Sequence, residues 1–138
     1  MKRLLPAVLT VLALVAALLA FSSPAPAVAD TGSSWGSATA ERQTLREGCR
    51  SYPFHYRIDV PGDTWMAEIT LANPAGTNIA TLTYESGRQP AAGTGRFRFC
   101  DVSTRPGRHT IRLKITSYDF RDQSVRRSAP TTFRLVHR

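Results

Sequence analysis

The sequence predicts an all-β protein: one antiparallel β-sandwich of about six to eight strands, preceded by a segment that is removed on export. Apolar and polar residues alternate with a period of two over most of the chain after residue 51, as they do in half-buried strands. Short segments that contain Gly and Pro separate these stretches, and no long amphipathic helix pattern interrupts them. A chain of 138 residues has room for one small core, which excludes a multidomain enzyme.

The first 29 residues have the organisation of a cleaved signal peptide. Lys2 and Arg3 give a positive start, an apolar run covers 4–21, and Ala27-Val28-Ala29 supplies the small-x-small pattern that signal peptidase accepts. A retained membrane anchor is the alternative, but the small residues after the run favour cleavage. The mature protein is therefore expected to be secreted, with no membrane span. Subtracting Lys2 and Arg3 from the 18 basic residues leaves 16 against 10 acidic ones, a net charge of +6.

Residues 30–47 are expected to be flexible, with Trp35 exposed, because 30–44 is rich in Ser, Gly, Thr and Ala. The folded sandwich domain is then expected over 48–138. Its first strand, 52–60, alternates aromatic and aliphatic side chains with polar ones and ends at Pro61-Gly62.

The second and third strands are expected to form a hairpin. Trp65 shares the phase of Leu71 in the second strand, 65–71, so it belongs in the core. Asn73-Pro74-Ala75-Gly76 fits a type I turn, with Pro at its second position and Gly at its fourth. The third strand follows over 77–84.

The last three strands are separated by polar segments rich in Gly, Pro or charged residues. We expect these strands over 96–102, over 110–118 and from 131 onward, with loops at 86–95 and 119–130 and a turn at 105–108. Phe97, Ile111 and Phe133 have the phase of core-facing residues in the three strands.

Cys49 and Cys100 are expected to form a disulfide bond, because an even number of cysteines in an exported protein pairs in an oxidising environment. The bond closes a loop of about 51 residues, which the chain-entropy model values at about 4 kcal/mol. A catalytic or metal-binding pair is disfavoured, because the two residues lack CxxC spacing and nearby His ligands.

The spacing of Cys49, Trp65 and Cys100 resembles that of an immunoglobulin domain, in which a core Trp packs on an inter-sheet disulfide. Two features depart from that pattern. Arg98 stands where that family has its corner Tyr, and both cysteines are out of phase with the apolar residues of their strands. The bond is therefore expected at a strand end or on an outer face. Ig-like and jelly-roll-like sandwiches both remain open.

Three motifs with Pro and Gly turns lie within roughly residues 54–116: Tyr56-Arg57-Ile58-Asp59-Val60-Pro61-Gly62, Asn73-Pro74-Ala75-Gly76-Thr77 and Pro106-Gly107-Arg108-His109-Thr110-Ile111. They resemble the motifs of bacterial pre-peptidase C-terminal domains. His109 stands where that family has Tyr, and the acidic segment that the family often uses for calcium is not visible. Such domains are non-catalytic appendages of secreted proteases, so the resemblance implies an accessory or binding role.

No group of residues has the spacing of a catalytic or metal site. Gly32-Ser33-Ser34-Trp35-Gly36 matches G-x-S-x-G, but it lacks the preceding strand and following helix of a nucleophile elbow. His55 and His109 are expected at the surface. Asp119 and Asp122 are expected to pair with neighbouring Arg residues rather than to share a calcium ion. We therefore predict no catalytic residue, no metal and no cofactor.

A basic surface is the strongest functional signal. Arg96 and Arg98 alternate with Phe residues, and Arg112 and Lys114 alternate with Ile and Leu, so all four project together into solvent if their strands share a sheet. The candidate anion-binding residues are Arg96, Arg98, Arg105, Arg108, Arg112 and Lys114. A solvated outer face that uses Arg as its ordinary polar residue is the alternative.

We predict a secreted, monomeric, non-catalytic binding or accessory domain. Its expected partners are an anionic polysaccharide, a cell-wall polymer or an acidic protein. The alternative is an inhibitor of an extracellular enzyme that presents the loop at 86–95 or 119–130. A small secreted hydrolase ranks third, because the sequence does not bring a nucleophile, a base and an orienting group together.

Overall fold

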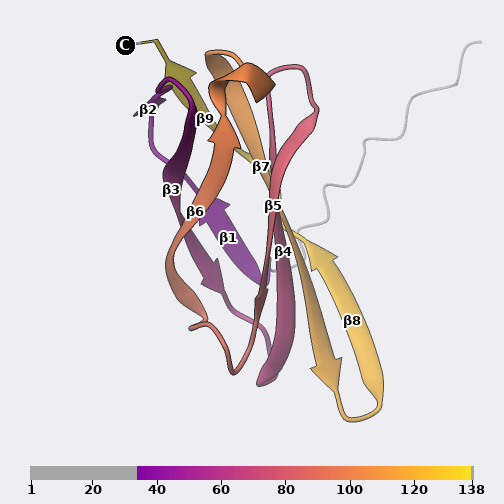
Figure 1. The fold of residues 1–138 in the computed structure, drawn as a ribbon. Coiled ribbons are helices and arrows are strands. Elements are labelled where there is room, and N and C mark those ends of the chain that lie inside the picture. Colours follow the sequence, from indigo (N-terminus) through magenta and orange to yellow (C-terminus); the bar gives the residue numbers. More distant parts are fainter. Residues whose placement is uncertain (1–33, 138) are drawn as a thin grey trace, which may run out of the picture. The chain divides into compact units, whose positions relative to one another are not determined.

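The computed structural model describes residues 34–137, which form nine strands in two sheets (Figure 1). The strands are β1 (Gly36–Thr39), β2 (Gln43–Thr44), β3 (Cys49–Ile58), β4 (Thr64–Ala72), β5 (Asn78–Glu85), β6 (Ala92–Cys100), β7 (Gly107–Asp119), β8 (Asp122–Arg127) and β9 (Thr131–Val136). One turn of 3-10 helix, η2 (Asp101–Ser103), follows β6. The all-β class is confirmed, whereas the expected signal peptide, 1–29, lies outside the described residues. Within 34–137, no helix is long and apolar enough to cross a membrane.

The strands divide into a smaller sheet A and a larger sheet B. Sheet A has the order β1-β3-β6, and sheet B has the order β2-β9-β7-β4-β5. Strand β8 pairs with the C-terminal part of β7, beyond the part that pairs with β9. Every pair is antiparallel except β2 with β9, which is parallel. This parallel pair departs from the antiparallel arrangement expected, because the chain passes from β1 in sheet A to the edge of sheet B.

The inner faces of both sheets bury one apolar core. Buried and exposed residues alternate along β3 and β6, because successive side chains of a strand point to opposite faces. Phe54 and Phe97 are completely buried and stack with their ring centroids 4.2 Å apart. Trp65 and Leu113 of sheet B belong to the same cluster, so the predicted core position of Trp65 is confirmed.

The turn between β4 and β5 lies where it was predicted and is closed by a hydrogen bond from its fourth residue to its first. The Gly76 N–H donates to the Asn73 carbonyl oxygen at 2.8 Å. The Asn73 Oδ1 accepts from the N–H groups of Ala75 and Thr77, both at 3.0 Å. Gly76 has a φ of +84°, which Gly adopts without a steric penalty. The hairpin expected from the second and third predicted strands is confirmed.

Residues 36–44 contain β1 and β2, whereas the sequence predicted a flexible segment over 30–47. Strand β1 pairs with β3 at the edge of sheet A. A side chain at Gly36 would collide with the backbone oxygen of Arg57. The small residues that suggested flexibility therefore permit β1 to approach β3 closely.

Trp35 is half-buried, so the exposed position predicted for it is wrong. Its side chain packs against the core cluster, and the Arg126 guanidinium lies 5.0 Å from the centroid of its ring. The Trp35 carbonyl oxygen also accepts the N–H of Asp59 at 2.5 Å. Trp35 therefore anchors the start of β1.

Residues 122–127 form β8 within the loop predicted over 119–130. All six residues of β8 are exposed, so the strand has no apolar alternation by which it could be predicted. Strands β7 and β8 form a hairpin with a two-residue turn at Phe120-Arg121, and this hairpin projects beyond the other strands (Figure 1). Phe120 is 100% exposed at the turn.

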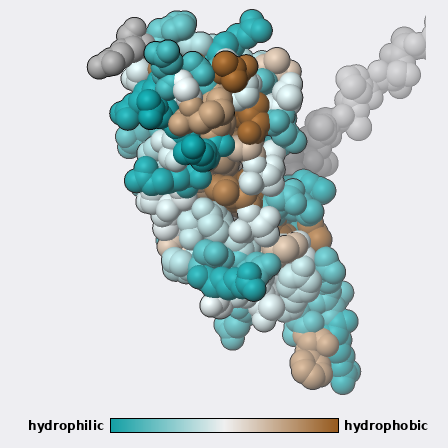
Figure 2. Space-filling model, in the orientation of Figure 1, coloured by the Kyte–Doolittle hydropathy of each residue, from teal (hydrophilic) through white to brown (hydrophobic). Residues whose placement is uncertain are grey.

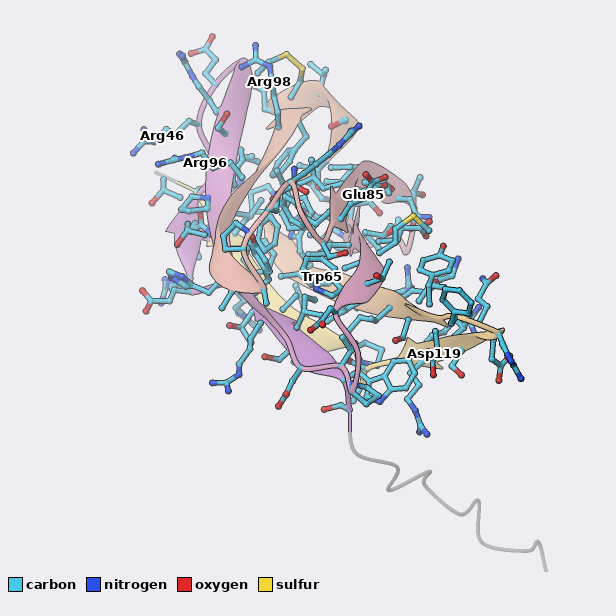
Figure 3. The ribbon with its side chains drawn as sticks, turned by 90° about the horizontal axis from the view of Figure 1, so that it is seen from below. Arg46, Trp65, Glu85, Arg96, Arg98 and Asp119 are labelled. Atoms are coloured by element: carbon cyan, nitrogen blue, oxygen red, sulfur yellow. A yellow bond between two sulfur atoms is a disulfide. The ribbon has the colours of Figure 1, made fainter. Side chains whose placement is uncertain are left out.

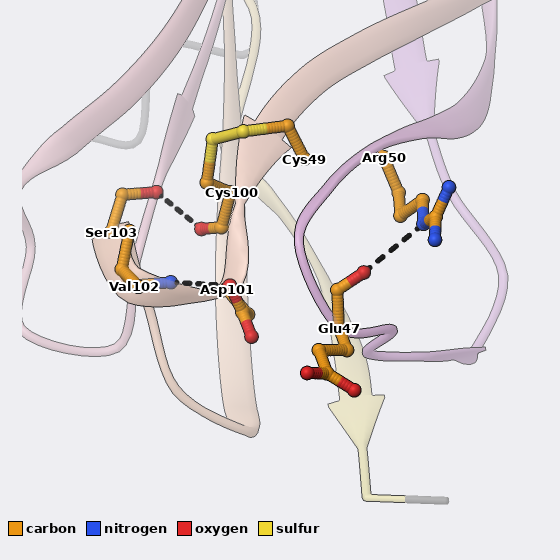
Figure 4. The surroundings of a disulfide bond; sticks show 7 residues. All are labelled: Glu47, Cys49, Arg50, Cys100, Asp101, Val102 and Ser103. Carbon is orange, nitrogen blue, oxygen red and sulfur yellow. Dashed lines mark hydrogen bonds between the residues drawn. A yellow bond between two sulfur atoms is a disulfide. The ribbon is translucent and has the colours of Figure 1, made fainter.

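The predicted Cys49–Cys100 disulfide is present (Figure 4). The two residues lie directly opposite each other where β3 begins and β6 ends. They share the phase of Ser51 and Pro53, which are exposed, so the bond lies on the outer face of sheet A. The expectation of a strand-end or outer-face position is confirmed. Because both strands belong to sheet A, the bond does not link the two sheets as in an immunoglobulin domain.

Candidate anion-binding faces

The structure divides the six candidate anion-binding residues between the two sheets. Arg96 and Arg98 lie in β6 of sheet A. The others are Arg108, Arg112 and Lys114 in β7 of sheet B and Arg105 in the turn before β7. Because the inner faces of the sheets share one core, their outer faces point away from each other. The single Arg surface expected if these strands shared a sheet is therefore not formed.

The outer face of sheet B carries five basic side chains. Arg112 and Lys114 project from it together because they are two residues apart in β7. Arg127 of β8 lies opposite Lys114 in the strand register, and Arg134 of β9 lies opposite Arg108. We call these five residues the sheet B basic face. Arg127 was missed in the sequence because β8 was assigned to a loop.

Three cations of the sheet B basic face line a hollow of about 430 Å³. The polar and charged side chains around this hollow include Arg112, Lys114, Arg127, Glu68, Thr70 and Asn78. The Arg112 Nη1 donates to the Asn78 Oδ1 at 3.2 Å, which orients the guanidinium. Glu68 is the one acidic residue of the lining, so the hollow has an excess of positive charge.

The outer face of sheet A carries a second group of cations. Arg96 lies opposite Pro53, and Arg98 lies opposite Ser51. Arg57 of β3 projects from the same face, opposite Ala92. In the space-filling view, hydrophilic residues cover the region of β3 and β6, and a smaller hydrophobic patch lies toward β5 (Figure 2).

The basic residues of both faces have no carboxylate partner among residues 34–137. The one ion pair in this range joins Arg88 to Glu85 at 3.6 Å, with side chains that are 78% and 47% exposed. Even Glu68, which lies opposite Lys114 in the register, makes no ion pair with it. The cations are therefore available to an external anion.

His109 is completely buried between the rings of Phe99 and Phe133, so its predicted surface position is wrong. Its Nδ1 lies 3.2 Å from the carbonyl oxygen of Gly107, and its Nε2 lies 2.7 Å from the hydroxyl of Thr104. Because a carbonyl oxygen only accepts, Nδ1 carries the proton and Nε2 accepts from Thr104. Burial lowers the pKa of His109 from its ordinary value of 6.5, and the hydrogen bond to Gly107 opposes this shift.

His55 is exposed on the outer face of sheet A, as predicted, with its Nδ1 3.1 Å from the Thr94 hydroxyl. His109 lies on the inner side of sheet B, so the two imidazoles do not meet. The G-x-S-x-G match begins outside the described residues and leads through Trp35 and Gly36 into β1. The described chain thus provides no nucleophile elbow.

Asp119 and Asp122 lie opposite each other at the β7–β8 turn. Each accepts a backbone N–H of the next residue, Phe120 at 2.6 Å and Gln123 at 2.8 Å. The expected ion pairs with neighbouring Arg residues are not formed. Within 34–137, no three His, Cys, Asp or Glu side chains gather as a metal ion requires.

The two loops considered for an inhibitor differ in the structure. In the first, 86–95, the last four residues belong to β6. The Tyr56 hydroxyl donates to the Pro90 carbonyl oxygen at 3.1 Å, which holds the rest of the loop against sheet A. The second, 119–130, forms the projecting β7–β8 hairpin with Phe120 at its turn. Only the second of these segments projects from the domain.

Comparison of the chain with protein-family models and with curated proteins finds no match.

Proposed function

We propose that this domain is a non-catalytic binding protein that acts outside the cell and holds anionic polymers on its sheet B basic face. The observation that carries the proposal is the hollow in which Arg112, Lys114 and Arg127 converge around a single acidic residue. The disulfide supports an oxidising compartment, in keeping with the signal peptide expected from the sequence. We also propose that the two sheets form a β-sandwich. Its ligand binds on an outer face of a sheet and not in a pocket of the core.

The spacing of the cations suits a polymer with repeated anionic groups. Side chains two residues apart in a strand are separated by roughly 7 Å, and neighbouring strands lie roughly 5 Å apart. Arg112 and Lys114 are related in the first way, and Lys114 and Arg127 in the second. Arg adds bidentate hydrogen bonding to phosphate or carboxylate groups. One small anion cannot contact all five residues of this face, whereas a flexible polyanion can follow them.

The test is a titration of the mature protein with long-chain polyphosphate and, in a second arm, with polygalacturonate. We expect binding that weakens steeply as salt rises from ~50 to ~200 mM, because contacts between cations and polymer release counterions. Comparison of the phosphate and carboxylate arms identifies the preferred anionic group. Arg112→Ser/Arg127→Ser should bind several-fold more weakly and with a shallower salt dependence.

A matched control is Arg88→Ser/Arg121→Ser, which removes the same charge from exposed turn positions that belong to neither basic group. It should bind like the wild type, and all proteins should have similar melting temperatures because exposed Arg residues contribute little to stability. If the sheet B variant binds as tightly as the control, the face is only a solvated surface and the proposal is wrong.

A second candidate function is inhibition of an extracellular enzyme, and it rests on Phe120. This side chain is 100% exposed at a two-residue turn, where an apolar anchor can enter a cleft of a partner. Inhibition of a panel of secreted hydrolases by the wild type, together with its loss in Phe120→Ala, would support this function. Equal inhibition by both proteins, or none by either, would contradict it.

A further inference from the structure

We infer that the domain has two anion-binding faces that point away from each other, so one molecule bridges two polyanion chains. The second is the sheet A basic face, formed by Arg46, Arg57, Arg96 and Arg98. The inference rests on the proposed function, because it adds a second site to the sheet B basic face. Bridging is a different property from binding, and it can fail while binding remains.

The strand register leaves the sheet A basic face without acidic neighbours in its own sheet. Arg98 lies opposite Ser51, and Arg96 lies opposite Pro53. Arg57, the third cation, lies between Ser37 of β1 and Ala92 of β6. None of these cross-strand partners carries a negative charge that would neutralise the Arg side chains.

The segment between β2 and β3 adds Arg46 to this face. The Arg46 N–H donates to the Tyr52 hydroxyl at 3.0 Å. The Gln43 Nε2 donates to the Pro53 carbonyl oxygen at 2.9 Å. These two bonds attach the segment to sheet A, while the Leu45 N–H just before it donates to the Val136 carbonyl oxygen of sheet B at 2.9 Å. Arg46 and Arg96 line one hollow of about 360 Å³. Figure 3 shows Arg46, Arg96 and Arg98 on the same side of the domain, away from Asp119 at the end of the β7–β8 hairpin.

The two basic faces cannot merge into one, because the core lies between them. Tyr52 and Phe97 of sheet A and Leu113 of sheet B share the buried cluster, and the cations alternate with these residues along their strands. Packed sheets lie roughly 10 Å apart, and the outer side chains add to that separation. A short oligoanion therefore occupies one face only, whereas a long polymer on one face leaves the other free for a second chain.

Stoichiometry with a short probe tests the number of faces. Titration of the mature protein with tripolyphosphate, followed by calorimetry, should give two equivalents bound per domain. Arg96→Ser/Arg98→Ser and Arg112→Ser/Arg127→Ser should each bind one equivalent. The control Arg88→Ser/Arg121→Ser, with the same loss of charge, should retain two. Circular dichroism and melting temperature confirm that each variant is folded.

Light scattering with long-chain polyphosphate then tests bridging. Wild type and control should form large assemblies whose scattering passes through a maximum as the ratio of polymer to protein rises, because excess polymer saturates both faces separately. Each single-face variant should still bind but should scatter at least several-fold less. Scattering by both single-face variants equal to that of the control would overturn bridging.

The outcomes separate the two proposals. Suppose that the wild type binds one equivalent of tripolyphosphate, that Arg96→Ser/Arg98→Ser retains it and that Arg112→Ser/Arg127→Ser loses it. This result would overturn the inference and leave the proposed function standing. If the wild type binds one equivalent that Arg112→Ser/Arg127→Ser retains and Arg96→Ser/Arg98→Ser loses, both the inference and the proposed function are wrong. Absence of any salt-sensitive binding would also overturn both.

Discussion

The buried imidazole of His109 makes the stability of the domain depend on pH. A proton on Nε2 would replace the acceptor that Thr104 uses with a donor. The Thr104 hydroxyl would then have to turn toward the Arg105 carbonyl oxygen, 3.4 Å away. The folded state therefore disfavours the protonated imidazole, as the lowered pKa of His109 indicates. The unfolded chain instead binds a proton near the ordinary value of 6.5.

We expect the free energy of unfolding of the wild type to fall as the pH drops below about 6.5, because the unfolded state then binds more protons than the folded state. The loss should stop once the pH falls below the lowered pKa. His109→Phe removes the titrating group and should reduce this decline. Urea denaturation of both proteins between about pH 5 and pH 8 measures it. His55 and His137 are present in both proteins, so their contributions cancel; equal slopes would contradict a role for His109.

In the sequence, His109 has the phase of core-facing residues. His109 precedes Ile111 and Leu113 by two and four positions, and side chains at these intervals point to the same face of a strand. The turn just before it and its polar ring suggested the surface instead. The partners that make burial tolerable, Thr104 and Gly107, are properties of the folded turn and cannot be seen in the strand pattern.

At the scale of elements, β1 depends on contacts that small residues permit. The Trp35 side chain covers part of the core, and Arg126 of β8 stacks over its ring. The Ser128 hydroxyl donates to the Gly36 carbonyl oxygen at 2.6 Å, and the Thr131 hydroxyl reaches the Ala38 carbonyl oxygen at 2.5 Å. These bonds attach β1 of sheet A to the segment after β8 and to the first residue of β9.

Both tryptophans should contribute to stability, and to different extents. Trp65→Ala should cost about 3–5 kcal/mol, because it empties a buried site. Trp35→Ala should cost about 1–2 kcal/mol, because it removes a half-buried side chain and its contact with the Arg126 cation. Chemical denaturation of the two variants measures both values. A change below about 0.3 kcal/mol for Trp35→Ala would show that β1 is not anchored by this residue.

The strands that the sequence predicted are those with one buried and one exposed face. All six expected strands are present as β3, β4, β5, β6, β7 and β9. The missed strand β8 is exposed throughout, as an edge strand with charged residues can be. Strand β1 contains Gly36, which lowers strand propensity although the close approach to Arg57 requires it. Period-two patterning thus identifies strands that pack on a core and overlooks those that cover its edges.

At the scale of the whole molecule, the sequence could not show which strands share a sheet. Arg98 and Arg112 have the same local pattern, each between two apolar neighbours. Their strands nevertheless belong to different sheets, because sheet order depends on pairings between distant segments. The sequence predicted one basic surface, whereas the structure has basic residues on two outer faces that point away from each other. Each face also has a cation from a segment in which the sequence predicted no strand: Arg46 of sheet A from the segment predicted to be flexible, and Arg127 of sheet B from a predicted loop.

The disulfide acts on the whole molecule through the unfolded state. Cys49 and Cys100 are separated by 51 residues, and the loop between them includes β4 and β5 of sheet B as well as β3 and β6 of sheet A. Cys49 is exposed and Cys100 is half-buried, so Cys49→Ser/Cys100→Ser adds no fully buried polar group to the folded state.

We expect the double variant to keep the native circular dichroism spectrum. Its free energy of unfolding should fall by about 2–4 kcal/mol, because the open chain gains conformational entropy. Denaturant midpoints of the two proteins measure the loss, and non-reducing peptide mass spectrometry of the exported wild type verifies the bond. An unchanged midpoint would contradict the stabilising role, and two free thiols in the exported protein would contradict the bond itself.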